Sequence, residues 1–185
     1  MGLFNRNNNN RNMNSSQRNR SNTNTHGYTP PQHTYYKGRQ DSQHSSQQLK
    51  DYGPYPFAIN IEQATKNNNT FRTALWTGPH MQLTLMSLLP GEDIGLERHP
   101  NVDQFIRIEE GTGMLMMGKD KDAPTLQQAV SDGYAFIIPA NTWHNLTNIG
   151  QTPLKLYSIY APAQHPFGTV HQTKAIAEEE EHPNN

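Results

Sequence analysis

The sequence contains no cysteine among its 185 residues. That absence excludes disulfide bonds, thiolate metal sites and cysteine nucleophiles. No apolar run approaches the roughly 18 residues that a membrane-spanning helix needs, and the N-terminus lacks the apolar stretch of a secretory signal. Arg6 stands where an N-terminal acylation signal has Ser or Thr. We therefore expect no membrane span, no signal peptide and no lipid anchor.

Apolar side chains are also scarce, at 32% of the sequence, and the charges are unevenly placed. Residues 1–50 hold seven basic side chains and one acidic side chain, whereas residues 51–185 hold eight basic and fifteen acidic side chains. The formal net charge of −1 thus combines +6 in the first region with −7 in the second. Residues 1–50, rich in Asn, Gln, Ser and Arg, cannot bury enough apolar surface to offset roughly 1–2 kcal/mol of backbone entropy per residue. We predict a disordered basic tail there.

The function of this tail is open on sequence alone. Its basic charge and three tyrosines would suit nucleic acid or an acidic surface, and its Asn and Gln content would suit self-association. No nucleic-acid-binding motif with helix or strand spacing occurs, so we do not expect nucleic acid as a partner. A solvated tail that binds nothing specific is one reading, and attachment to a protein assembly through residues 1–50 is another.

After the tail, short apolar runs alternate with turn residues. Residues 51–70 form a lead-in segment whose residues 54–61 could pair along a sheet edge, and residues 71–172 form the main domain. No twelve-residue helical period interrupts that domain, which predicts an all-β fold of antiparallel strands. Residues 173–185 form an acidic C-terminal tail, of which residues 173–181 are expected to be helical. The expected strands are Phe71–Trp76, Met81–Leu89, Gln104–Ile108, Met114–Met117, Leu126–Val130, Tyr134–Ile138 and Leu154–Tyr160.

Two motifs in this region contain candidate metal ligands. The first reads Gly-x5-Glu-x-His-x4-Gln-x6-Gly and carries Glu97, His99 and Gln104. Glu97 and His99 lie two residues apart, so on a strand both side chains point to one face, and Gln104 can return to that face after a bend. The second reads Gly-x5-Pro-x-Asn-x2-His-x3-Asn and carries His144 just after a turn that Asn141 can form, because Asn tolerates left-handed backbone.

These four side chains are predicted to converge on one mouth of the domain. Two imidazoles, a carboxylate and an amide oxygen suit a divalent ion such as Fe, Mn, Ni, Co or Zn. Without a metal, Glu97 and His144 could instead form an acid/base pair. The metal ligands we predict are Glu97, His99, Gln104 and His144.

Both motifs, in this order, resemble those of the cupin superfamily, Gly-x5-His-x-His-x3–4-Glu-x6-Gly and Gly-x5-Pro-x-Gly-x2-His-x3-Asn. The resemblance spans about residues 71–161 and implies a double-stranded β-helix, or jelly-roll barrel, with a metal usually held by three His and one Glu. Here Glu97 replaces the first His and Gln104 replaces the Glu, so the ligand charge stays at −1. Asn141 replaces the second motif's glycine.

Three stretches, 103–111, 143–145 and 156–162, look like those of small bacterial single-domain cupins often named mannose-6-phosphate isomerase-like. This implies a metal-dependent isomerase or dioxygenase acting on a small carbohydrate or organic acid, with Glu97 as the catalytic proton carrier. Two alternatives are a non-enzymatic cupin that binds a small ligand, and a structural barrel. The structural barrel would form a homodimer through its outer sheet and attach by its tail to an assembly such as a spore coat. The expected location is accordingly cytoplasmic or spore-associated.

Other polar residues near the motifs receive structural interpretations. Arg98 and Arg107 are out of phase with the ligands and are expected to face solvent or a second subunit, which argues against a clamp for a sugar phosphate. Trp143 is expected to pack on the face opposite His144. His165 and His171 could rim the pocket or anchor the C-terminal segment, and we favour the second interpretation.

Overall fold

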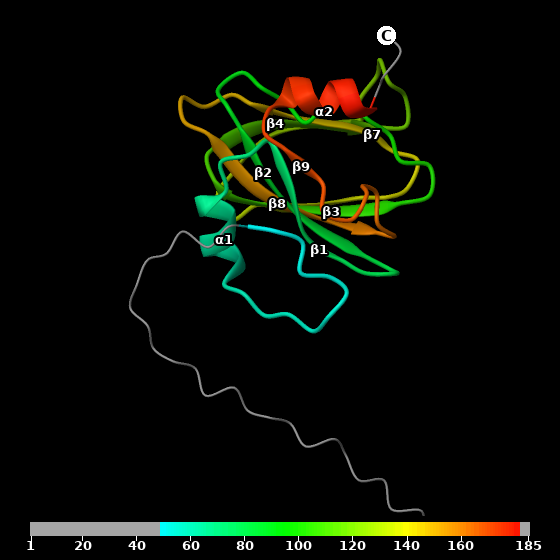
Figure 1. Ribbon diagram of the computed structural model, residues 1–185. Coiled ribbons are helices and arrows are strands. Elements are labelled where there is room, and N and C mark those ends of the chain that lie inside the picture. Colours follow the sequence, from blue (N-terminus) through cyan, green and yellow to red (C-terminus); the bar gives the residue numbers. More distant parts are fainter. Residues whose placement is uncertain (1–48, 182–185) are drawn as a thin grey trace, which may run out of the picture. The chain divides into compact units, whose positions relative to one another are not determined.

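The computed structural model of the protein describes residues 49–181 (Figure 1). The predicted tail, residues 1–50, lies almost wholly outside this part. The described elements are α1 (Ile61–Asn67), β1 (Arg72–Thr77), β2 (Gln82–Leu88), β3 (Asp103–Glu110), β4 (Thr112–Gly118), β5 (Leu126–Ser131), β6 (Ala135–Ile138), β7 (Trp143–Asn148), β8 (Leu154–Ala161), β9 (Val170–His171) and α2 (Lys174–Glu181).

The strands form two antiparallel sheets. The larger has the order β6-β3-β8-β2-β1-β9, and the smaller has the order β5-β4-β7. The two sheets face each other as the layers of a barrel (Figure 1). Residues 91–99 run antiparallel beside β7 without forming a regular strand, through isolated bridges at Asp93 with Thr147 and Glu97 with His144. This segment extends the smaller sheet and carries half of the first motif.

The core between the sheets follows from the period of two along the strands. On β3, Ile106 and Ile108 are fully buried while Arg107 between them is exposed. Leu154 and Leu156 of β8 face the same interior. The described domain consists of two antiparallel sheets and two short helices, so the all-β prediction is confirmed.

All seven predicted strands are present, and two more strands were not predicted. β7 carries His144, Asn145 and Asn148, so its sequence does not alternate between apolar and polar residues, although its side chains are largely buried. β9 has only two residues, Val170 and His171, and pairs with β1. Asn148 helps to hold β7 in place, because its Nδ2 donates to Leu88 O and to Thr152 O, both at 2.9 Å, and sequence periodicity does not detect such contacts.

The lead-in segment differs from the prediction. Tyr52 N donates to Leu75 O at 2.9 Å, but the only regular element that the structure describes between residues 51 and 70 is helix α1. Asn60 caps α1 by accepting from Gln63 N at 3.0 Å. The segment packs with Leu75 and Leu85 in a second, smaller apolar cluster. Seven residues are too few to show a helical period, so α1 escaped prediction.

Helix α2 confirms the predicted C-terminal helix. Ala177 is buried in the main core, Lys174 Nζ lies 2.8 Å from Asp93 Oδ1, and His171 Nε2 lies 3.1 Å from Glu180 Oε2. His171 therefore anchors this segment, as expected. Neither α1 nor α2, the two helices of the described part, has the length and apolar character to cross a membrane.

Candidate metal centre

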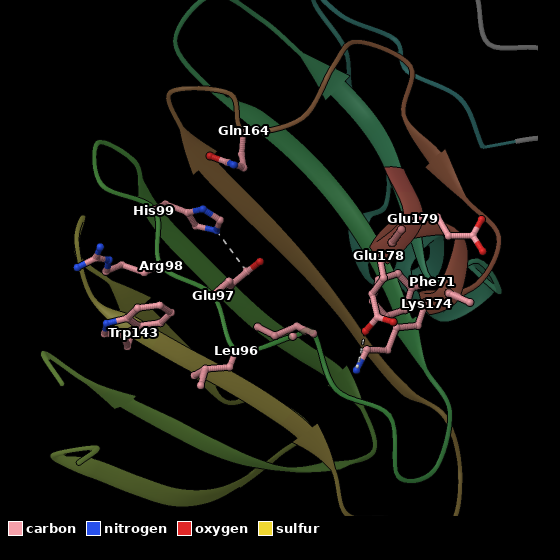
Figure 2. Close-up of a pocket in the computed structure, with 14 residues that line it drawn as sticks. Phe71, Leu96, Glu97, Arg98, His99, Trp143, Gln164, Lys174, Glu178 and Glu179 are labelled. Atoms are coloured by element: carbon pink, nitrogen blue, oxygen red, sulfur yellow. Dashed lines mark ion pairs between the residues drawn. The ribbon is translucent and has the colours of Figure 1, made fainter. Parts of the chain in front are cut away.

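A cavity of about 970 Å³ lies between residues 94–99, β7 and helix α2. Figure 2 shows Glu97 and His99 turned toward each other on its wall. The lining residues are Phe71, Ile94, Gly95, Leu96, Glu97, Arg98, His99, Trp143, Gln164, Lys174, Ala175, Ala177, Glu178 and Glu179. The first motif thus meets the start of β7 and helix α2 around one space.

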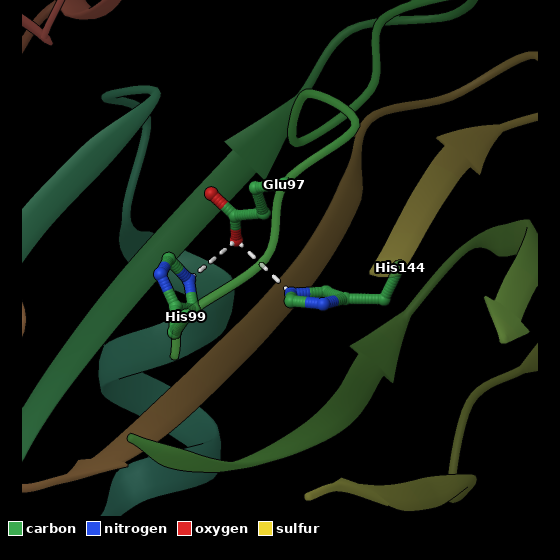
Figure 3. Close-up of side chains that lie close together, drawn as sticks. All are labelled: Glu97, His99 and His144. Carbon is green, nitrogen blue, oxygen red and sulfur yellow. Dashed lines mark hydrogen bonds and ion pairs between the residues drawn. The ribbon is translucent and has the colours of Figure 1, made fainter. Parts of the chain in front are cut away.

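Glu97, His99 and His144 form a tight group beside this cavity (Figure 3). One ligand atom from each lies within 4.8 Å of those of the other two. Glu97 Oε1 is 3.2 Å from His99 Nε2 and also 3.2 Å from His144 Nε2. Glu97 and His144, which lie 47 positions apart in the chain, therefore present their donor atoms to one point.

The backbone fixes this geometry. Glu97 N donates to His144 O at 3.1 Å and His144 N donates to Glu97 O at 3.0 Å, which holds the two residues directly opposite each other. Asn141 N donates to His99 O at 2.8 Å. Asn141 has a φ of 65°, the left-handed conformation that an Asn tolerates in place of glycine. The turn expected from Asn141 therefore docks on the first motif.

The group is largely shielded from water. His144 is 1% exposed, His99 is 9% exposed and the Glu97 side chain is 19% exposed. Burial alone would raise the pKa of the Glu97 carboxyl, but the contacts with His144 and His99 outweigh it and lower the pKa to about 2. Glu97 is therefore a carboxylate that needs positive charge beside it.

The tautomer of His144 shows how a cation would satisfy the group. His144 Nδ1 lies 2.9 Å from the Thr142 carbonyl oxygen, which can only accept, so Nδ1 carries a hydrogen. Nε2 then presents its lone pair to the Glu97 carboxylate unless the ring takes a second proton. Without a metal ion, His99 Nε2 and His144 Nε2 would each need a proton to face the Glu97 carboxylate favourably. A metal ion bound by both imidazoles and Glu97 would take the place of these two protons, so these residues fit a metal ion.

Gln104, the fourth predicted ligand, lies on the inward face of β3. It is 2% exposed, and its Nε2 donates to Ser158 Oγ at 2.9 Å. Its Oε1 is buried and has no hydrogen-bond partner among residues 49–181. An amide oxygen in this state is an available metal donor.

Two aromatic neighbours continue the polar interior beyond His99. The Tyr160 ring meets the His99 ring edge to face at 5.9 Å, and the His165 ring meets Tyr160 at 5.2 Å. Burial, reinforced by the positive charge of Arg72, lowers the pKa of His165 to about 3. Gln82 holds the His165 backbone, accepting from its N at 2.9 Å and donating to its O at 2.9 Å. His165 is thus a neutral, half-buried residue outside the three-residue group.

Two residues line the cavity although the sequence pattern did not predict it. Arg98 does point away from Glu97 and His99, yet it still lines the cavity, with its guanidinium 5.0 Å from the centre of the Trp143 ring (Figure 2). Trp143 lines the cavity as well, instead of packing only on the opposite face, and Lys121 Nζ lies 5.6 Å from the same ring. For Arg98 the alternation argument failed because residues 94–99 are not a regular strand. Arg107 lies away from this cavity, on the exposed face of β3, paired with Glu109 at 3.1 Å.

Comparisons with known proteins agree with the fold and the motifs. A family model described as a cupin domain matches residues 84–160. The "Uncharacterized protein YrkC" of Bacillus subtilis (strain 168) is 69% identical over 129 residues, covering 70% of this chain and 69% of that protein. The "Uncharacterized protein L612" of Acanthamoeba polyphaga mimivirus is 45% identical over 115 residues, covering 62% and 70% respectively.

A solved structure gives the same result in three dimensions. The crystal structure of BH2720 from Bacillus halodurans is 62% identical, covers 70% of this chain and 98% of its own, and superposes with a TM-score of 0.69. The two motifs, the two facing sheets and these matches give one answer: the chain belongs to the cupin family.

Proposed function

We propose that this protein is a metal-binding cupin that holds a small organic molecule in the cavity beside its metal. Glu97, His99 and His144 would bind the ion, with Gln104 as the fourth ligand. The observation that carries this proposal is one carboxylate oxygen lying 3.2 Å from two imidazole nitrogens. Because His144 Nδ1 is committed to the Thr142 carbonyl, its Nε2 is the atom left to bind a cation.

The donor set narrows the choice of ion. Imidazole nitrogens favour Mn, Fe, Co, Ni or Zn over Mg or Ca, and the carboxylate and amide oxygens suit the harder members of that series. The ligands carry one negative charge, so a bound divalent ion would keep a net positive charge. Such an ion supplies Lewis acidity toward an oxygen of a bound molecule.

The cavity supports a small-molecule ligand. Its volume of about 970 Å³ suits a small organic molecule. Leu96, Phe71 and Trp143 give it apolar walls, and Gln164 and Arg98 add polar groups. A carbohydrate or organic acid of this size could undergo an isomerase-like or dioxygenase-like reaction, with Glu97 accepting and returning a proton. Binding without turnover is the alternative.

Assembly stays a prediction. The outer face of the large sheet carries Ile137, which is 67% exposed beside its cross-strand neighbour Phe105, and this pair would suit the expected homodimer. Attachment through residues 1–50 concerns a segment that lies almost wholly outside the described residues.

Metal titration of the purified protein tests the proposal. We expect one Mn²⁺ or Co²⁺ per chain in isothermal titration calorimetry, and an affinity at least about 100-fold lower in His144→Ala, because a ligand is lost outright. Glu97→Gln keeps an oxygen donor but removes the charge, so we expect a smaller loss. His80→Ala is the control, because His80 is an exposed loop residue. A wild-type protein that binds no metal, or a His144→Ala variant that binds like wild type, contradicts the proposal.

A further inference from the structure

Three adjacent strands of the large sheet, β3, β8 and β2, turn polar side chains into the barrel. Thr84 of β2 and Ser158 of β8 are register partners, and both are 0% exposed. Gln104 of β3 is opposite Tyr160, two residues along β8 from Ser158. These three side chains form a buried polar row.

The row contains one hydrogen bond with a consequence for the metal. Gln104 Nε2 donates to Ser158 Oγ at 2.9 Å, while Gln104 Oε1 has no hydrogen-bond partner among the described residues. A glutamine can bind a metal only through its oxygen, so its NH2 group must then find an acceptor elsewhere. In a buried site, an NH2 group without an acceptor is strongly disfavoured.

We propose that Ser158 is a positioning residue for the metal site. It accepts from the Gln104 amide nitrogen and thereby leaves the amide oxygen free to face the ion. This inference rests on the proposed metal site and adds a residue that neither motif contains. A hydroxyl is well suited to the position because it would also donate to a carboxylate, so Ser158 is compatible with Gln or Glu at position 104.

Thr84 supplies a matched control. Its Oγ1 is buried beside Ser158 and has no hydrogen-bond partner within residues 49–181. Thr84→Val removes this hydroxyl at nearly constant shape, whereas Ser158→Ala removes the hydroxyl that binds Gln104. The two substitutions alter neighbouring positions of the same row and differ in whether the amide loses its partner.

A double-mutant cycle with Co²⁺ tests the proposal. We expect Ser158→Ala to weaken Co²⁺ binding by about 10- to 100-fold, the range for losing a group that orients a ligand, and to change the visible absorption of the bound ion. Thr84→Val should bind Co²⁺ within about twofold of wild type. In a Gln104→Ala background, Ser158→Ala should have no further effect, because the amide that it orients is gone.

The outcomes separate this inference from the proposed function. If wild type binds Co²⁺, His144→Ala does not, and Ser158→Ala binds like wild type, the inference is wrong and the metal site stands. The inference is also wrong if Ser158→Ala lowers Co²⁺ affinity by the same factor in the Gln104→Ala background as in the wild type. If wild type binds no Co²⁺, the proposed function fails and the inference falls with it. Circular dichroism verifies that each variant folds. If Ser158→Ala unfolds, Ser158→Cys replaces it, because the thiol keeps a weaker acceptor, and we expect an intermediate loss of Co²⁺ affinity. Wild-type affinity in Ser158→Cys would then overturn the inference.

Discussion

The two ends of the barrel interior are built differently, although the same strands line both. Along β3, Gln104 at one end is followed on the inward face by Ile106 and Ile108. Along β8, Leu156 precedes Ser158 on the same face. Because the strands are antiparallel and in register, the apolar residues gather at one end and the polar residues at the other.

β2 and β7 also change from polar to apolar side chains along their length. On β2, Thr84 precedes Met86, and on β7, His144 precedes Leu146, all of them buried. The apolar end removes hydrocarbon surface from water and so stabilises the fold. The polar end buries groups that lose water without full replacement, among them Gln104 Oε1. Stability therefore resides mainly at one end of the barrel interior, and the candidate binding groups lie at the other.

Truncating a side chain at the apolar end of the barrel interior should change the stability of the protein most. Leu156→Ala removes a fully buried side chain from the main core, so we expect the free energy of unfolding to fall by about 2–5 kcal/mol. Metal affinity of the folded variant should stay within about twofold of wild type. Urea denaturation of metal-free protein measures the first quantity and calorimetry the second. If Ser158→Ala lowered the free energy of unfolding as much as Leu156→Ala does, the contrast between the two ends would disappear.

The polar end should make stability depend on pH. Burial lowers the pKa of His165 to about 3, well below its ordinary value near 6.5, so only the unfolded chain takes up this proton between those values. The contribution of neutral His165 to the free energy of unfolding is therefore fully present above about pH 6.5, and it is lost as the pH falls toward 3. His165→Gln should reduce the loss between pH 7 and pH 5 by about 2 kcal/mol.

Thermal and urea unfolding of metal-free protein at both pH values checks this expectation. His80→Gln is the matched control, because His80 is exposed in a loop. An unchanged pH dependence in His165→Gln would show that His165 is not held neutral in the folded protein.

Removing the N-terminal region, which belongs to neither end of the barrel interior, should change the stability of the protein least. The described contacts of the domain begin at Leu49, which packs in the smaller apolar cluster. Removal of residues 1–48, too poor in apolar side chains to form a core, should change the free energy of unfolding by less than about 0.5 kcal/mol. A shift of several degrees in the melting temperature would contradict the prediction of a disordered tail.

Much of the fold could be predicted because its signals are local. Runs such as Met81–Leu89 alternate between faces, and Gly and Pro separate the strands. The grouping of Glu97 with His99 follows from their spacing of two, which places both on one face. Their meeting with His144 required the resemblance to a known family, since local spacing does not bring distant segments together.

The remainder depended on contacts that no local pattern contains. The hydrogen bond from Gln104 to Ser158 joins residues 54 positions apart. Arg98 lines the cavity because the segment before His99 departs from strand geometry, and Trp143 lines it from the start of β7. Seven residues were too few for α1 to be recognised.

Above all, we predict that a metal ion binds among the donor atoms of Glu97, His99 and His144. Anomalous diffraction from crystals of the protein loaded with Mn²⁺ tests it most directly. We predict one strong anomalous peak about 2.0–2.3 Å from these donor atoms, with Gln104 Oε1 as the fourth protein ligand. No peak at this position, or a peak only beside the exposed acidic residues Glu178–Glu180 of α2, would contradict it.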